Sequence, residues 1–262
     1  MKAREMPSFA TLEVPHRFGE PKKQLAWIDA QLALTAPLAL TAPLALTAPL
    51  ALTAPLADLV VLPETALTGY VSAAGNYDLS AFAEPRDGAT EHALIALARK
   101  HRCALLAPLV EREGAACFNS ALFIDADGAV LAHYRKRHPW MPESWATPGS
   151  RPAPLFAWRG LTLTIAICFD VHFLAEESGE ALRAADVLLF PSAWTELGDT
   201  RPQMLPELAR EFGCAIVNAN WGRSVPRIPG QGQSLIVSAR GEILASGGPL
   251  ARAAIERRKA AT

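Results

Sequence analysis

Short apolar segments alternate with amphipathic segments of helical length along almost the whole chain, and this alternation limits the folds that it can adopt. The apolar segments predict strands at residues 9–14, 59–62, 103–110, 119–124, 130–134, 161–167, 187–190, 215–218 and 234–238. Amphipathic periodicity predicts helices at residues 21–34, 90–101, 176–185 and 202–212. Residues 125–128 and 239–242 have the composition of hairpin turns. This order of elements indicates a layered α/β protein.

A fainter internal similarity divides the chain into two halves. Residues 57–63, Ala-Asp-Leu-Val-Val-Leu-Pro, resemble residues 185–191, Ala-Asp-Val-Leu-Leu-Phe-Pro. Residues 98–104 and 209–215 match as well, because each segment begins with Ala-Arg and ends with Cys-Ala. Two similar βα halves packed sheet against sheet predict a four-layer α-β-β-α sandwich in one domain over residues 1–262.

A perfect repeat interrupts this pattern. Residues 32–55 repeat the hexapeptide Leu-Ala-Leu-Thr-Ala-Pro four times without a deviation. No charged residue occurs from 30 to 57, a length that could cross a bilayer, but the proline of each unit would break a helix at roughly 3 kcal/mol. A helix would also turn the leucines to all sides, whereas an extended chain places them on one face. We therefore expect a low-complexity loop or edge-strand-like insert, and no membrane span.

Composition excludes several classes of function. The 25 Lys and Arg residues almost balance the 26 Asp and Glu residues, so a nucleic-acid partner is not expected. The four cysteines have no Cys-x-x-Cys spacing and no nearby histidine pair, which predicts free thiols in a reducing compartment and no metal site. The N-terminus lacks the apolar run of a secretion signal, which favours the cytoplasm.

Three chemically active side chains follow directly after predicted strands: Glu64, Lys136 and Cys168. Strand ends are where α/β scaffolds present functional groups to a crevice. A thiol is a strong nucleophile, but it needs a base to accept its proton and a cation to stabilise negative charge. Glu64 and Lys136 supply these two roles. Taken singly, each signal is weak, because a cysteine in an apolar strand is usually a core thiol and a Glu or Lys at a strand end is more often simply solvated. The other three cysteines are expected to be core thiols.

The sequence around these three residues resembles the nitrilase, or carbon-nitrogen hydrolase, superfamily. The matching motifs are Leu-Pro-Glu64 with Gly69-Tyr70, Tyr134-Arg135-Lys136 and Ile167-Cys168-Phe169-Asp170. The resemblance extends over about residues 9–246 and includes 191–194, 218–221 and 230–234. It implies an α-β-β-α sandwich that forms a homodimer or a larger homo-oligomer, a Glu64-Lys136-Cys168 catalytic triad, and no metal or organic cofactor.

The resemblance also implies which residues meet the substrate. Residues 139–143 resemble the aliphatic-amidase branch, in which a second glutamate helps to position the substrate, and Glu143 matches that glutamate. The Phe169 backbone N–H would stabilise negative charge together with the triad lysine. Apolar walls are expected from Tyr70, Trp140, Phe169 and Trp194, although aromatic residues more often build an ordinary core.

Three features depart from the family pattern. His172 stands where the family usually has an arginine, and residues 173–176 are one residue longer than the common form. We expect His172 to bind a substrate carboxylate, to orient Asp170, or to lie in a surface loop without a role. Basic residues 252–259 predict a helix, after which the chain stops without the longer extension that embraces a partner subunit in many relatives.

These residues predict hydrolysis of the non-peptide C–N bond of a small amide. Cys168 would form a thioester as ammonia leaves, and water would then release the carboxylic acid. The motifs do not separate this reaction from hydrolysis of a small nitrile, and acyl transfer to an amine is a further possibility. A catalytically silent interaction module, with the hexapeptide array as its contact surface, is the alternative from another class; retention of all three triad residues disfavours it.

Overall fold

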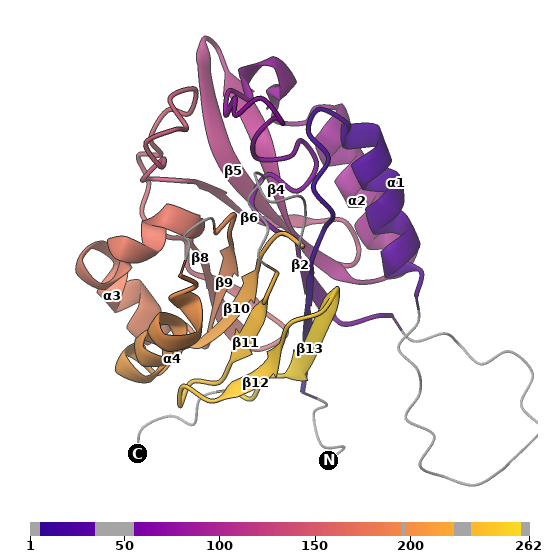
Figure 1. Ribbon diagram of the computed structural model, residues 1–262. Helices are drawn as coiled ribbons and strands as arrows, with labels where there is room; N and C mark the ends of the chain where they lie inside the picture. The colour runs from indigo at the N-terminus through magenta and orange to yellow at the C-terminus, as the bar shows by residue number, and fades with distance from the viewer. Residues whose placement is uncertain (1–5, 35–54, 195–197, 223–231, 258–262) are drawn as a thin grey trace, which may run out of the picture.

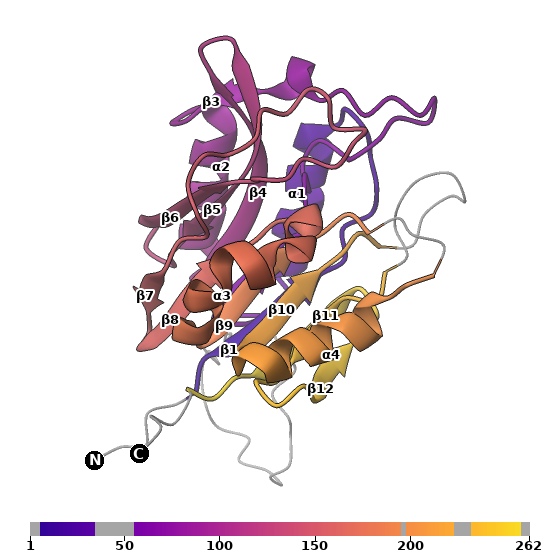
Figure 2. The same ribbon diagram turned by 90° about the vertical axis from the view of Figure 1, so that its left-hand side faces the viewer.

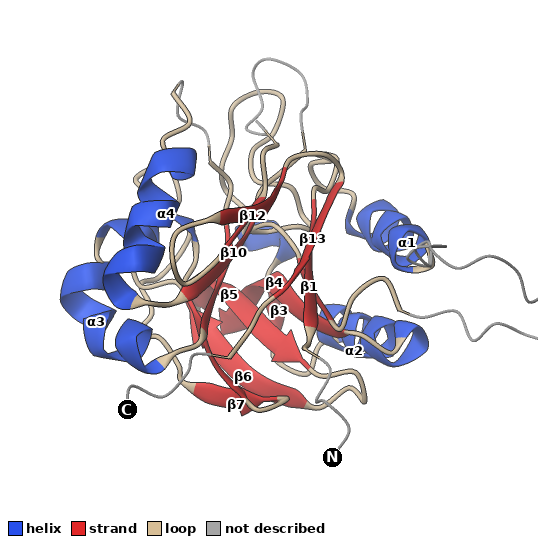
Figure 3. Ribbon diagram, turned by 90° about the horizontal axis from the view of Figure 1, so that it is seen from below, coloured by secondary structure: helices blue, strands red, loops and turns tan. Residues whose placement is uncertain are grey.

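Two β-sheets pack face to face, and a pair of helices covers the outer face of each sheet (Figures 1 and 3). This computed structural model describes residues 6–34, 55–194, 198–222 and 232–257. The α/β fold class and the four-layer α-β-β-α sandwich predicted from the sequence are confirmed.

The first sheet comes mainly from the N-terminal half. Its strands are β1 (Ser8–Leu12), β2 (Leu59–Val61), β3 (Glu84–Pro85), β4 (Ala104–Glu113), β5 (Ala116–Ile124), β6 (Val130–Arg135) and β13 (Leu250–Ala254). They follow the order β13–β1–β2–β4–β5–β6, with β3 beside β4. β1, β2 and β4 are parallel, whereas β5 and β6 continue the sheet antiparallel. The turn predicted at residues 125–128 connects β5 to β6 and is closed by two backbone hydrogen bonds of Asp125.

The second sheet has the same arrangement. Its strands are β7 (Phe156–Trp158), β8 (Leu161–Ile165), β9 (Val187–Pro191), β10 (Ala215–Ala219), β11 (Leu235–Val237) and β12 (Ile243–Ser246), in the order β12–β11–β10–β9–β8–β7. β8, β9 and β10 are parallel, and the flanking pairs are antiparallel. The similar segments 57–63 and 185–191 therefore contain equivalent inner strands, β2 and β9, each between two parallel neighbours.

Four helices bury their apolar faces on the outer sides of the sheets. α1 (Pro21–Leu32) and α2 (Ala89–His101) cover the first sheet, and α3 (Leu174–Ala184) and α4 (Arg201–Phe212) cover the second (Figure 2). Proline in the first turn of α1 and α4 suits a helix start, since the N–H that proline lacks has no intrahelical acceptor there. Gly213 ends α4 in the left-handed conformation. The predicted helix limits agree with the structure to within two residues.

The prediction of a helix over residues 252–259 is wrong for the part that the structure describes. Residues 250–254 form β13, which pairs antiparallel with β1 along its whole length. The basic composition indicated an exposed helix, but pairing with the edge of the first sheet satisfies the backbone of this segment instead. Strands β3, β7 and β12 were not predicted either, because each includes exposed positions. The equally short strands β2 and β11 were predicted, since all their residues are apolar and buried.

The hexapeptide array falls almost entirely at positions 35–54, outside the described residues, so its conformation stays a prediction. None of the helices in the described part of the chain is long and apolar enough to cross a membrane.

Candidate active site

Glu64, Lys136 and Cys168 lie just beyond the ends of β2, β6 and β8. Cys168 also begins a short 3₁₀ helix, η2 (Cys168–His172). The chain turns sharply at two of these points, because Cys168 and Thr65 have φ angles of +44° and +50°, which non-glycine residues seldom adopt. Backbone strain of this kind is found mainly where the surrounding structure holds a functional side chain in place. All three functional side chains are buried.

Lys136 connects two buried glutamates. Its Nζ donates to Glu64 Oε1 at 2.7 Å and to the two carboxylate oxygens of Glu143 at 2.8 and 2.9 Å. The Lys136, Glu64 and Glu143 side chains are 0%, 0% and 1% exposed. The Nδ2 of Asn119 donates to the same Glu64 Oε1 at 2.8 Å. Glu64 Oε2, in contrast, has no hydrogen-bond partner among the described residues and is the oxygen left to accept a proton.

Glu143 is held by two groups in addition to Lys136. The Tyr70 hydroxyl donates to its Oε1 at 2.7 Å, and the Trp140 backbone N–H donates to its Oε2 at 3.2 Å. The rings of Tyr70 and Trp140 stack with centroids 6.4 Å apart. The second glutamate predicted from the sequence therefore joins the lysine to the aromatic residues of the adjoining pocket.

Burial and the charges of this cluster shift the pKa of Glu64. Burial raises the pKa of Glu64, the Lys136 ammonium opposes the rise, and the neighbouring Glu143 adds to it, so that the pKa reaches about 7. Two carboxylates thus share one buried ammonium, and a proton on Glu64 becomes easy to gain or lose near neutral pH. A group with such a pKa is suited to act as a general base.

The same surroundings raise the pKa of both the Cys168 thiol and the Lys136 ammonium, but for different reasons. Burial and the negative charge of Glu64 raise the pKa of the Cys168 thiol, although Lys136 opposes the rise. Burial alone would lower the pKa of Lys136, but Glu64 and Glu143 outweigh burial and raise it. Lys136 therefore stays charged, while Cys168 stays a thiol until a base takes its proton.

Asp170 connects the turn that carries the thiol to the segment that follows the lysine. Its carboxylate accepts four hydrogen bonds, from the Tyr134 hydroxyl at 2.9 Å and from the backbone N–H groups of Ile167, Arg137 and His138 at 3.0, 3.1 and 2.9 Å. Buried backbone N–H groups require such partners. Asp170 is therefore a structural clamp between two parts of the site.

His172 does not orient Asp170, whose oxygens are taken by these four donors, so that expectation is wrong. The exposed imidazole instead lies against aromatic rings, with centroids 4.9 Å from Phe169 and 5.9 Å from Trp194. At this position it borders the opening to the thiol. Contact with a substrate and a surface position without a role both stay predictions.

A small pocket opens onto Cys168. Its volume is about 120 Å³, and besides Cys168 and Ala193 its walls are formed by five residues named in the sequence analysis, Tyr70, Trp140, Phe169, His172 and Trp194. Glu143 is absent from the walls, but it accepts the hydrogen bond of the Tyr70 hydroxyl. The indole N–H of Trp194 is buried and has no hydrogen-bond partner among the described residues. The structure thus brings all nine predicted site residues into one region.

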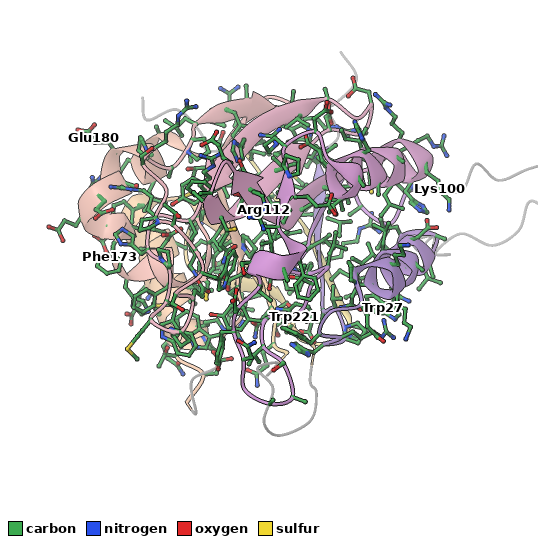
Figure 4. All side chains as sticks on the ribbon, turned by 90° about the horizontal axis from the view of Figure 1, so that it is seen from above. Trp27, Lys100, Arg112, Phe173, Glu180 and Trp221 are labelled. Atoms are coloured by element: carbon green, nitrogen blue, oxygen red, sulfur yellow. The ribbon has the colours of Figure 1, made fainter. Side chains whose placement is uncertain are left out.

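Two residues of the site were not singled out from the sequence. Asn119 contacts Glu64 through its side chain, and the Trp221 indole N–H donates to the Glu64 backbone oxygen at 2.9 Å. Trp221 is fully buried, and in Figure 4 it lies between the helices that carry Trp27 and Lys100 and the opposite side, where Phe173 and Glu180 are labelled. An asparagine within the apolar segment 117–124 and a tryptophan in the matched segment 218–221 were the available signals.

Within the described residues, no group of three or more His, Cys, Asp or Glu side chains is arranged to hold a metal ion. All four cysteines lie within the described residues, are buried and form no disulfide bond.

Comparison with known proteins relates this site to one family. The carbon-nitrogen hydrolase family matches residues 25–256. A Pseudomonas protegens protein named "Hydrolase in pqqF 5'region" is 31% identical over 198 residues, which cover 73% of this chain and 68% of that protein. An "(R)-stereoselective amidase" from Pseudomonas sp. is 32% identical over 133 residues, 50% of this chain and 47% of the relative, so this alignment spans about half of each.

A solved structure agrees over nearly the full length. The crystal structure of an amidase from Nesterenkonia sp. superimposes with a TM-score of 0.77 at 25% identity, covering 96% of this chain and 91% of the amidase. Fold and sequence comparisons therefore lead to the same group of hydrolases.

Proposed function

We propose that this chain, which belongs to the carbon-nitrogen hydrolase family, hydrolyses the C–N bond of a small amide to a carboxylic acid and ammonia through a cysteine thioester. The observation that carries the proposal is the buried Glu64–Lys136–Glu143 cluster beside the Cys168 thiol. Similarity to the Pseudomonas amidase and the Nesterenkonia amidase supports an amide as the substrate class.

The first step is attack by the thiol. Glu64 Oε2 takes the proton of Cys168 as Sγ bonds to the amide carbon, so the net charge of the buried cluster does not change. Lys136 and the Phe169 backbone N–H stabilise the oxyanion that develops on the former carbonyl oxygen. Glu143 keeps Lys136 in position for this role through its two hydrogen bonds.

The next steps release the two products. Glu64 gives its proton to the amide nitrogen, the C–N bond breaks, and ammonia leaves behind a thioester on Cys168. Glu64 then takes a proton from water as the water oxygen attacks the thioester carbon. Collapse of the second tetrahedral intermediate breaks the C–S bond, and the proton on Glu64 returns to the sulfur as the acid is released.

The pocket supports a small acyl group. Its volume of about 120 Å³ is well below the roughly 300–1,000 Å³ of pockets that hold drug-sized ligands. Tyr70, Trp140, Phe169 and Trp194 present aromatic surface to the substrate, and His172 at the edge offers one polar contact beyond the reacting group.

Ammonia release tests this proposal. Purified protein is incubated with a panel of amides, nitriles and carbamoyl compounds, with Cys168→Ala as the control. We expect release from small amides by the wild type and none by the control. Release from nitriles alone would contradict amide hydrolysis, release that survives Cys168→Ala would contradict the thiol mechanism, and release from no compound would favour the silent interaction module.

We further propose a single domain over residues 1–262 that acts in the cytoplasm as a homodimer or larger homo-oligomer. Three apolar side chains on β12 and β13, two strands consecutive in the chain, are exposed: Ile243, Leu244 and Leu250 at 46%, 42% and 37%. Apolar surface of this kind supports a subunit contact. Light scattering checks the mass, and a monomer at micromolar concentration would contradict this assembly.

A further inference from the structure

We propose that Asn119 is a positioning residue that selects the oxygen of Glu64 that acts as the base. The side-chain amide holds Oε1, and Oε2 is thereby directed to the thiol. This inference rests on the proposed function in one respect, since it takes Glu64 to be the group that accepts the Cys168 proton.

Asn119 contacts both charged members of the triad. Its Nδ2 donates to Glu64 Oε1 at 2.8 Å, and its backbone oxygen accepts the Lys136 backbone N–H at 2.8 Å. Lys136 Nζ reaches the same Glu64 oxygen at 2.7 Å. Asn119, a buried residue of β5, therefore holds both the backbone at Lys136 and the carboxylate of Glu64 in place.

The hydrogen bonds of Glu64 are unequal, because both of its side-chain donors reach the same oxygen. Oε1 receives Asn119 and Lys136, whereas Oε2 receives no donor from the described residues. The terminal torsion of a glutamate is broad, so one donor alone leaves the carboxylate free to exchange its two oxygens. Asn119 on β5 and Lys136 just after β6 both donate to Oε1, so the carboxylate can no longer exchange its two oxygens. The lone pairs of Oε2 remain available for a proton.

The side chain of Asn119 also carries a disadvantage for folding. Its Oδ1 is buried and has no hydrogen-bond partner among the described residues. An apolar residue of similar size would avoid the penalty of an unpaired buried carbonyl. An asparagine at this position is therefore explained by its donor to Glu64 and not by packing.

The donor has an electrostatic consequence as well. A hydrogen bond to an ionised carboxylate favours the charged form, so Asn119 lowers the pKa of Glu64 against the effect of burial. Loss of the donor should raise that pKa and move the acid side of the pH profile upward.

Alkylation of Cys168 tests the proposal without any knowledge of the substrate. The rate of iodoacetamide addition at Cys168 is followed by peptide mass spectrometry from pH 5 to 9 in the wild type, Asn119→Leu and Asn119→Ala. Ser120→Ala is the matched control, because Ser120 is the next residue of β5 and its hydroxyl bonds to Glu111, outside the site. We expect both Asn119 variants to react about tenfold more slowly at pH 7, with the acid limb shifted upward by up to about one pH unit. Asn119→Ala covers the case in which Asn119→Leu does not fold.

An unchanged acid limb in the folded Asn119 variants would overturn the proposal, and so would the same shift in Ser120→Ala. Measurement of Glu64→Gln in the same series separates this failure from failure of the proposed function. If Glu64→Gln retains the wild-type rate and pH profile, Glu64 is not the base and the proposed function fails. If Glu64→Gln loses the acid limb while the Asn119 variants keep it, only the positioning role is wrong.

Discussion

Two buried glutamates, Glu111 on β4 and Glu64 just beyond the end of the neighbouring strand β2, have pKa values shifted in opposite directions. Burial raises the pKa of Glu64 to about 7. Burial would raise the pKa of Glu111 as well, but hydrogen bonds from His133, Arg135 and Ser120 outweigh it and lower the pKa to about 2. Both carboxylates are 0% exposed and burial raises both pKa values, so the opposite directions of the two shifts come from the partners of each carboxylate.

The difference comes from the donors that each carboxylate receives. Both oxygens of Glu111 are bonded, Oε2 by Ser120 and His133 and Oε1 by Arg135. Glu64 has one bonded oxygen, one oxygen that receives no donor from the described residues, and a second carboxylate nearby. A saturated carboxylate is a structural ion, whereas a half-bonded one that shares its cation can exchange a proton near neutral pH.

Neighbouring residues of β5 and of the end of β6 donate the hydrogen bonds to both glutamates. Asn119 and Lys136 serve Glu64, whereas the adjacent Ser120 and Arg135 serve the other glutamate. Successive side chains point to opposite faces of a sheet, so Asn119 and Ser120 can contact different glutamates although they are neighbours in the chain.

The largest effect on turnover is expected from removal of the nucleophile, which belongs to the Glu64 site alone. Cys168→Ala should abolish turnover and leave the fold intact, because a small buried side chain is removed and no other group can form the thioester. Steady-state kinetics and circular dichroism check both parts. Activity within tenfold of the wild type would contradict the assignment.

Substitution of each glutamate should then give opposite results. Glu64→Gln should lower kcat by about 10² to 10³, as expected for a missing general base, and Lys136→Ala should have an effect of similar size. Glu111→Gln should keep kcat but lose about 1 to 3 kcal/mol of unfolding free energy, because three donors lose a charged acceptor. Urea unfolding and kinetics on the same samples test the contrast, which fails if Glu111→Gln is inactive while folded.

The pH dependence of stability should differ in sign between the sites. The pKa of Glu111 is depressed from 4.5 to about 2, so its contribution is present above pH 4.5 and is lost as the pH falls towards 2. The pKa of Glu64 is raised from 4.5 to about 7, so its contribution is present below pH 4.5 and is lost as the pH rises through 7. Urea midpoints should show a weaker loss from pH 5 to 8 in Glu64→Gln and a weaker loss below pH 4.5 in Glu111→Gln. Wild-type slopes in both variants would refute these assignments.

The smallest effect on the chemistry is expected from the hexapeptide array. One unit suffices for a connection of ordinary length, and deletion of residues 38–55 removes three. We expect unchanged rate constants at saturating substrate, with any change confined to oligomeric mass or to access to the site. Light scattering and kinetics compare the two proteins, and a loss of kcat would show that the array contributes to catalysis.

Much of this molecule follows from sequence pattern because local rules and packing agree. The internal similarity of residues 57–63 and 185–191 identified equivalent strands, and strand ends indicated Glu64, Lys136 and Cys168. Strand β13 was missed because its pairing with β1 joins residues about 240 positions apart, which no local pattern reports. Asn119 was missed for a similar reason, since its meaning depends on Glu64, a residue from another strand.

The central claim is that a thioester forms on Cys168 when Glu64 accepts its proton. Intact-mass and peptide spectrometry of the protein with a slowly hydrolysed amide measures this most directly. We expect an acyl adduct on Cys168 in the wild type, slower formation of that adduct in Glu64→Gln and none in Cys168→Ala. A substrate-dependent adduct on Cys103, Cys117 or Cys214, or turnover of the amide without any covalent intermediate, would contradict it.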